Sequence, residues 1–111
     1  MEVEARCMDA VKPLMQAYEK VEDAIAIIES GGRMIFAGGK VKLAREAVDM
    51  AAALTTISEE KAEKIKELLT KARKAIWERD RATALKTLEN VKDALVGEVL
   101  EKYHECRKGG A

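Results

Sequence analysis

Apolar residues recur at alternating steps of three and four positions along almost the whole chain. The first such run begins at Val11 and continues through Leu14, Tyr18, Val21, Ile25 and Ile28. Because an α-helix completes a turn every 3.6 residues, this spacing places the apolar side chains on one face of a helix. Only 4% of the residues are aromatic, whereas sheets favour aromatic side chains. The sequence therefore predicts an all-helical chain with an aliphatic core.

Glycine pairs and capping residues divide the 111 residues into four predicted helices of one domain. We expect helices over residues 3–30, 40–57, 59–78 and 81–106, followed by a flexible tail at 107–111. The glycine pairs at 31–32 and 38–39 bracket a Gly-rich connection between the first and second helices, and Ser58 and Asp80 are suited to cap the third and fourth. Short connections between four helices predict an antiparallel four-helix bundle or a close variant.

Pro13 is the one obstacle inside the first predicted helix. Proline has no backbone N–H to donate. Either the helix starts near Lys12 with Pro13 in its first turn, or a longer helix from Glu2 is kinked at Pro13. We favour a kinked or restarted helix.

The second predicted helix is apolar on two sides. One stripe consists of Val41, Ala44, Val48 and Ala51, and the other of Leu43, Ala47, Met50, Leu54 and Ile57. A bundle needs only one broad apolar stripe per helix. If the monomer buries both stripes, charge is left as the means of association, and if one stays exposed, a dimer or a partner groove is implied. We expect this helix to be the most buried of the four.

Cys7 and Cys106 are the only cysteines and lie near opposite ends of the sequence. Without a C-x-x-C spacing they give little support to a zinc or redox site. Two free thiols are the simpler interpretation. In an even-numbered up-and-down bundle, however, the first helix begins where the last one ends, and intracellular proteins of hyperthermophiles do form disulfides. A disulfide between Cys7 and Cys106 is therefore a second hypothesis.

The composition predicts a thermophilic and cytoplasmic protein. The N-terminal residues lack the order of a secretory signal, and the longest stretch without a charge, 50–58, has nine residues, so neither secretion nor contact with a membrane is expected. Charged residues make up 36% of the chain, whereas Asn and Gln occur once each. This balance is typical of hyperthermophile proteins.

Two sequence patterns approach known ligand-binding motifs without completing them. Glu101-x-x-His104 is half of the di-iron motif of helical bundles, but that motif needs two such pairs and His104 is the only histidine. The stretch 31–40 lacks a phosphate-binding loop's first glycine and its final hydroxyl residue, because Met34 and Val41 stand at those positions. We predict no metal site and no cofactor.

Catalysis is not predicted either. Ser30 and Ser58, the only serines, have no evident activating partner. Acidic residues mostly fall outside the apolar stripes, where nothing desolvates one carboxylate of a pair. We therefore predict a protein that is not an enzyme and has no small-molecule substrate.

Charge is distributed unevenly, although 20 basic and 20 acidic residues cancel over the whole chain. Residues 1–30 carry three basic and seven acidic groups, whereas residues 61–86 carry nine basic and four acidic groups. The basic residues around the third predicted turn and near the glycine loop form a candidate nucleic-acid-binding face: Arg33, Lys40, Lys42, Arg45, Lys71, Arg73, Lys74, Arg79, Arg81 and Lys86.

A neutral protein can bind nucleic acid through one such face when its acidic surface points elsewhere. Trp77 is the only aromatic residue nearby, so we expect contacts to the phosphate backbone rather than base readout. A solvated surface laced with salt bridges is the alternative interpretation. Opposite charges on two faces would also let copies of the chain stack head to tail.

The size, the helical class and the segment Arg33-Met34-Ile35-Phe36-Ala37, followed by the apolar helix 43–54, carry a resemblance to a known family. The chain resembles the small helical subunit of archaeal type I CRISPR effector complexes, the Cascade-type surveillance assemblies. The resemblance implies a non-catalytic subunit of an antiviral defence complex, present in several copies that line a filament and help to hold crRNA and target DNA.

The predicted function is that of a non-catalytic structural subunit of a larger, nucleoprotein assembly. It would contact nucleic-acid backbone through the basic face, and other protein subunits and further copies of itself through opposite charge. The alternative is a free-standing homodimeric bundle that acts as a protein-binding adaptor through the exposed face of one helix. The two hypotheses differ in where apolar surface is left over.

Overall fold

The structure is a computed structural model that describes residues 2–109, with the side chains of residues 7–107. Its helices are α1 (Glu2–Glu29), α2 (Met34–Ala53), α3 (Glu59–Trp77) and α4 (Arg81–Gly109). Within residues 2–109 there is no strand. The predictions of an all-helical chain and of four helices are confirmed.

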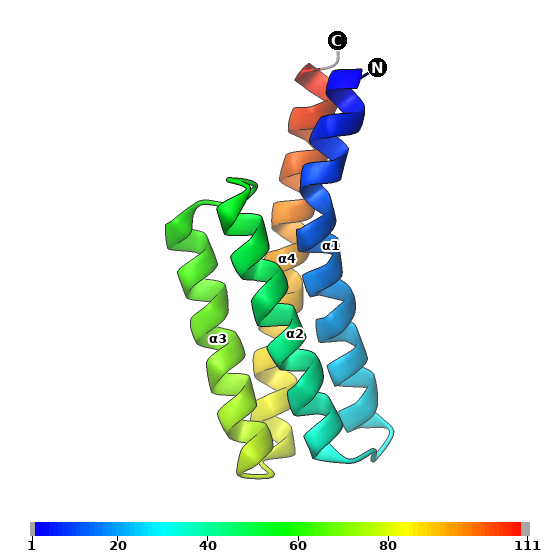
Figure 1. Cartoon of the computed structure of the whole chain (residues 1–111). Helices are drawn as coiled ribbons and strands as arrows, with labels where there is room; N and C mark the ends of the chain where they lie inside the picture. The colour runs from blue at the N-terminus through cyan, green and yellow to red at the C-terminus, as the bar shows by residue number, and fades with distance from the viewer. Residues whose placement is uncertain (1, 110–111) are drawn as a thin grey trace.

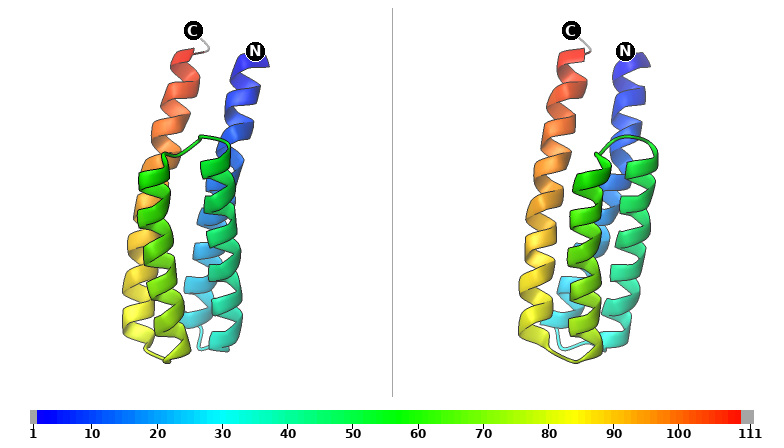
Figure 2. Two further views of the ribbon diagram at one scale, coloured as in Figure 1. Left: turned by 60° about the vertical axis from the view of Figure 1, so that its left-hand side comes forward. Right: turned by 90° about the vertical axis from the view of Figure 1, so that its left-hand side faces the viewer.

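The helices form a bundle with one long pair and one short pair. Each helix packs against its neighbours in the sequence, and α1 also packs against α4. The α1–α2 and α3–α4 connections lie together at one end, whereas α1 and α4 extend past α2 and α3 at the other (Figures 1 and 2). With 28 and 29 residues against 20 and 19, the long pair exceeds the short pair by about 13 Å at 1.5 Å per residue.

Aliphatic side chains fill the space between the helices. The largest fully buried ones include Leu14 and Ile28 of α1, Leu69 of α3, and Leu88 and Leu95 of α4. Burying one such side chain completely stabilises the fold by about 1.5–3 kcal/mol. The expectation of an aliphatic core is met among the described side chains.

α1 runs through Pro13 without interruption. Val11, Pro13 and Leu14 are all buried, so tertiary packing holds this turn although Pro13 cannot donate a hydrogen bond. The helix is not restarted near Lys12, and that alternative is wrong.

The connection between α1 and α2 is shorter than predicted. Gly31 adopts the left-handed conformation, with φ +78°, and the Gly32 N–H donates to the carbonyl of Ile27 at 2.8 Å, which terminates α1. α2 then begins at Met34 rather than at residue 40, so Gly38 and Gly39 lie inside the helix. The start at residue 40 is wrong because burial of Ala37 and Val41 outweighs the low helix propensity of two glycines, about 1 kcal/mol each.

The ends of α2 and α4 also differ from the prediction. α2 stops at Ala53, not at 57, because Thr55 takes a φ of +57° and the chain turns so that Ile57 enters the core. The hydroxyl of Thr56 donates to the Ala10 carbonyl at 2.7 Å, which ties this turn to α1. α4 continues to Gly109 through the first residues of the predicted tail, and residues 110–111 lie outside the described part of the chain.

The two apolar sides of α2 have different environments. Val41, Ala44, Val48 and Ala51 are buried, as is Ala37 one turn earlier. Of the second stripe, Ala47 is half-buried and Ile57 is buried, whereas Leu43, Met50 and Leu54 are exposed. The monomer therefore leaves apolar surface on α2, which is the outcome that implies a dimer or a partner groove. The expectation that α2 is the most buried helix is wrong, because five of its residues are buried against six of α3.

Candidate functional site

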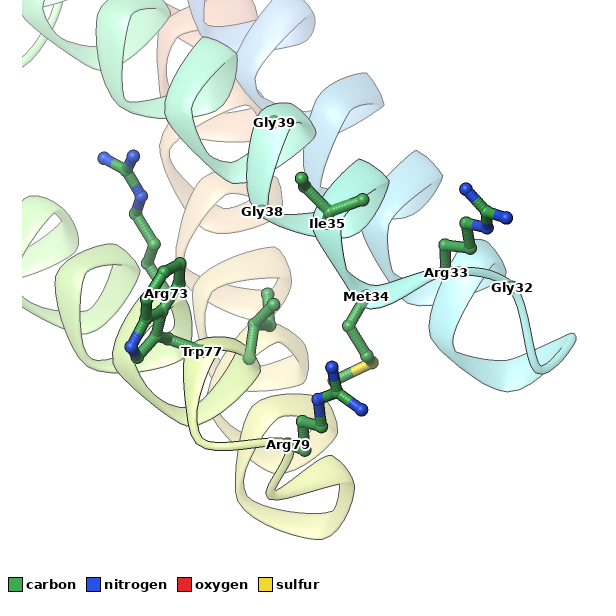
Figure 3. Close-up of a pocket in the computed structure, with 10 residues that line it drawn as sticks. Gly32, Arg33, Met34, Ile35, Gly38, Gly39, Arg73, Trp77 and Arg79 are labelled. Carbon is green, nitrogen blue, oxygen red and sulfur yellow. The ribbon is translucent and has the colours of Figure 1, made fainter.

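A hollow lies between the start of α2 and the end of α3. Its volume is about 850 Å³, within the size range of ligand pockets. The hollow is lined by Gly32, Arg33, Met34, Ile35, Gly38, Gly39, Arg73, Ile76, Trp77 and Arg79. Arg73 and Trp77 rise from α3 on one side, Arg33 stands at the start of α2 on the other, and Arg79 lies between them (Figure 3). We call these three arginines and Trp77 the basic site.

Two helical glycines leave part of this surface without side chains. A Cβ atom on Gly38 would lie 3.7 Å from the Ile76 side chain, an ordinary contact, and one on Gly39 would meet no atom within 4 Å. The packing of the monomer therefore does not require glycine at either position, although alanine would favour the helix by about 1 kcal/mol at each. The glycines let another molecule approach the backbone of α2 closely.

Trp77 is the last residue of α3 and its side chain is 86% exposed. Ile76 takes the buried position of the stripe, and Trp77 points away from the core. An indole face in water is unfavourable for a monomer. Trp77 is also the only tryptophan of the chain.

Arg79 occupies a backbone position that usually belongs to glycine. Its φ is +58°, its N–H donates to the Ile76 carbonyl at 3.0 Å, and the Asp80 N–H donates to the Ala75 carbonyl at 2.8 Å. These bonds form the left-handed cap that terminates many helices. An arginine here costs about 1 kcal/mol or more in backbone strain.

The basic site is strongly cationic. None of its three arginines takes part in an ion pair among the side chains of residues 7–107, and no carboxylate lines the hollow. The first N–H groups of α2 add partial positive charge at the same place. Guanidinium groups and the start of a helix both attract anions.

Other residues of the predicted face are occupied elsewhere. Lys40 pairs with Asp23 of α1 at 3.6 Å, Lys74 pairs with Glu78 at 3.9 Å, and Arg81 donates to the carbonyl of Ile28. Lys40 and Arg81 thus connect α2 and the start of α4 to α1, whereas the exposed Lys74–Glu78 pair joins two residues at the end of one helix.

The remaining predicted residues are exposed but lie outside the hollow. Lys42 and Arg45 follow Gly38 along α2, and Lys71 and Lys86 lie on α3 and α4. Residues two apart on a helix do not face the same way, so Lys71 and Arg73 point to different sides of α3. The structure thus brings together Arg33, Arg73 and Arg79 and separates them from the other predicted residues.

Ion pairs across the helix seams are structural. Lys66 lies 2.7 Å from Asp49 of α2, and this hydrogen bond raises the pKa of Lys66. On the opposite side of α3, Lys61 lies 3.2 Å from Glu98 of α4, and the hydrogen bond to Glu98, followed by its charge, raises the pKa of Lys61. Both pairs fix α3 against its neighbours.

The structure places the residues considered for metal binding and catalysis in ordinary roles. His104 is exposed with its ring edge near Tyr103, and Glu101 lies 3.6 Å from Lys61. Over the described residues, His, Cys, Asp and Glu side chains nowhere gather in a group of three that could hold a metal ion. The Ser58 hydroxyl accepts the Lys61 N–H as the cap of α3.

A second, apolar hollow of about 330 Å³ lies between α1 and α4. It is lined by Met15, Tyr18, Glu19, Glu22, Val96, Val99 and Leu100.

In the part of the chain that the structure describes, no helix has the length and apolarity that crossing a membrane requires.

Comparisons with known proteins find no matching family model, no similar curated protein and no similar solved structure. The fold and the hollow define a small helical bundle with a cationic and aromatic surface site.

Proposed function

We propose that this chain is a non-catalytic nucleic-acid-binding subunit of a larger assembly, and that the basic site is its contact with the nucleic acid. The observation that carries the proposal is that Arg33, Arg73, Arg79 and the exposed Trp77 line one hollow that has no carboxylate in its lining. Guanidinium groups bind phosphates in a bidentate manner, and an indole is a platform for a base.

The site favours a single strand over a duplex. A base can stack on Trp77 only if its face is not already covered by neighbouring bases, as in single strands, loops and ends. Each stacked base contributes about 1–3 kcal/mol and does so with little regard to sequence. The arginines hold the phosphates that flank the base, and the open space beside Gly39 leaves room for the strand.

The fluorescence of Trp77 gives a direct test, since it is the only tryptophan. Titration with single-stranded oligothymidylate is expected to quench it in a saturable manner, and a duplex of equal length to quench it less. With three phosphate contacts, the plot of log affinity against log salt concentration should have a slope of about −2.

A matched pair of double variants separates the basic site from general electrostatics. Arg73→Glu with Arg79→Glu should weaken binding at least tenfold and flatten the salt dependence, whereas Lys71→Glu with Lys86→Glu, the same change of charge outside the hollow, should have a much smaller effect. An equal loss of affinity in the two double variants would show that the basic site is not the contact. Absence of binding by the wild type would overturn the proposed nucleic-acid-binding function.

Membership of a Cascade-type complex, the copy number and the cytoplasmic setting stay predictions from the sequence. The adaptor alternative is supported by one observation, the exposed apolar stripe of α2. A self-associating subunit that also binds nucleic acid would account for both surfaces.

A further inference from the structure

The apolar hollow between α1 and α4 collects large side chains that the monomer leaves in water. Met15, Val96 and Leu100 are 46%, 37% and 53% exposed, and all three line the hollow. Tyr18 and Val99, which are partly buried against the core, complete its apolar lining. Single exposed apolar side chains are normal on a protein surface, but a concave group of them marks a binding surface.

The hollow has the form of a groove for one more helix. α1 and α4 pack against each other and run side by side (Figures 1 and 2). On α1 the lining residues Met15, Tyr18 and Glu22 follow one another at steps of three and four, and on α4 Val96 and Leu100 are four apart. Helices pack against a neighbouring helix through side chains at this spacing. A third helix therefore fits along the groove between α1 and α4.

The charged groups in the lining of this hollow are both acidic. They are Glu19 and Glu22 of α1, and no basic residue of the described chain lines the hollow. Glu19 takes part in no ion pair among the side chains of residues 7–107. Glu22 lies 3.9 Å from Lys92, and both side chains are partly exposed. An apolar partner would cover these carboxylates without supplying a counter-charge, whereas Lys or Arg would pair with them and cover apolar surface with their stems.

We propose that the hollow between α1 and α4 docks an amphipathic helix of a partner protein, whose apolar face is bordered by Lys or Arg. This contact goes beyond nucleic-acid binding, and it uses the two helices that do not form the basic site. The exposed apolar stripe of α2 in a second copy suits the hollow less well. Glu46, which neighbours Leu43 and Met50 on α2, would add a carboxylate to the acidic edge.

Two synthetic helical peptides of about three heptads serve as probes, both with leucine at the a and d positions. The other positions carry lysine and alanine in the basic peptide, and glutamate and alanine in the acidic one. The fluorescently labelled basic peptide, dilute enough to be monomeric, should bind the wild type saturably and gain helical circular dichroism. Absence of saturable binding would overturn the proposal.

A matched pair of double variants locates the contact. Met15→Gln with Leu100→Gln should weaken binding of the basic peptide at least tenfold, whereas Leu43→Gln with Met50→Gln, the same change on the stripe of α2, should leave it unchanged. All four side chains are exposed, so both variants should keep the helical circular dichroism of the wild type. Equal losses of affinity in the two variants would overturn the proposal.

Reversal of the acidic edge tests the charge of the partner. Glu19→Lys with Glu22→Lys should weaken binding of the basic peptide at least tenfold and strengthen binding of the acidic peptide. An unchanged preference would show that charge does not select the partner and would overturn the basic helix as the occupant. A wild-type dimer in sedimentation equilibrium that Met15→Gln with Leu100→Gln dissociates would show that a second copy covers the hollow, which also contradicts the proposal. The measurements involve no nucleic acid, so their outcome is separate from that of the proposed binding function.

Discussion

Cys7 and Cys106 are joined by a disulfide bond, with their Cα atoms 5.6 Å apart, although 99 residues separate them in the sequence. The bond connects the start of α1 to the end of α4, in the part of the long pair that α2 and α3 do not cover (Figure 1). It thus holds together the projecting ends of α1 and α4.

Reduction of this disulfide is expected to destabilise the chain by about 4–5 kcal/mol, because a loop of this length loses much of its unfolded-state entropy when it is closed. The midpoint of thermal unfolding should fall by roughly 15 °C or more. Circular dichroism melting with and without reductant measures the difference. The double variant Cys7→Ser with Cys106→Ser should unfold at the same temperature as the reduced protein, whether or not reductant is present. Two reactive thiols in the unreduced wild type would contradict the bond.

Replacing Arg79 is expected to separate stability from binding. Arg79→Gly removes the strain of a φ of +58° and should raise the free energy of unfolding by about 1 kcal/mol, while it weakens the binding of single-stranded oligonucleotide. Urea unfolding and the Trp77 titration measure the two effects.

Thr55→Gly is the matched control for Arg79→Gly. Thr55 has a φ of +57° at the end of α2, far from the basic site, so glycine should also relieve strain there and leave the oligonucleotide affinity unchanged. If Arg79→Gly and Thr55→Gly bind the oligonucleotide with the same affinity, the Arg79 side chain has no role in the basic site.

The helices could be predicted from the sequence wherever local signals and burial agree. Ser58 accepts the Lys61 N–H, and Asp80 accepts the Thr83 N–H, as their capping positions predict. Gly38 and Gly39 misled the prediction because local propensity marks glycine pairs as breaks. The burial of Ala37 that keeps them helical depends on contacts with the rest of the bundle.

The basic site could be predicted only in part. The density of basic residues pointed to Arg33, Arg73 and Arg79, but it could not reveal which groups have partners in other helices, such as Lys40 with Asp23. The position of Trp77 one residue after the buried Ile76 was a usable signal for its exposure. The left-handed conformation of Arg79 has no signal in the sequence, because glycine is the residue that usually marks it.

Arg81 is expected to contribute to stability and not to binding, although it lies two residues from Arg79. Its guanidinium donates to the Ile28 carbonyl in the last turn of α1, so Arg81→Ala should lower the free energy of unfolding by about 1–2 kcal/mol. Arg73→Ala, which breaks no hydrogen bond found in residues 7–107, should change it by less than about 0.5 kcal/mol. Urea unfolding of the two variants makes the comparison, and equal stabilities would show that the Arg81 hydrogen bond is without consequence.

Asp80 is expected to make α4 sensitive to acid. Its carboxylate accepts the Thr83 N–H at 3.2 Å, and its hydrogen bonds to Thr83, side chain first and then backbone, lower the pKa of Asp80. A carboxyl whose pKa is lower in the folded chain than in the unfolded chain stabilises the fold above its unfolded pKa of about 3.9, and this contribution is lost as the pH falls through the folded pKa. Asp80→Asn keeps a capping oxygen that does not titrate. Between about pH 5 and pH 2, the free energy of unfolding of the wild type should therefore fall more than that of Asp80→Asn. Urea unfolding at a series of pH values measures both. Parallel pH profiles of the two proteins would show that the cap works without its charge.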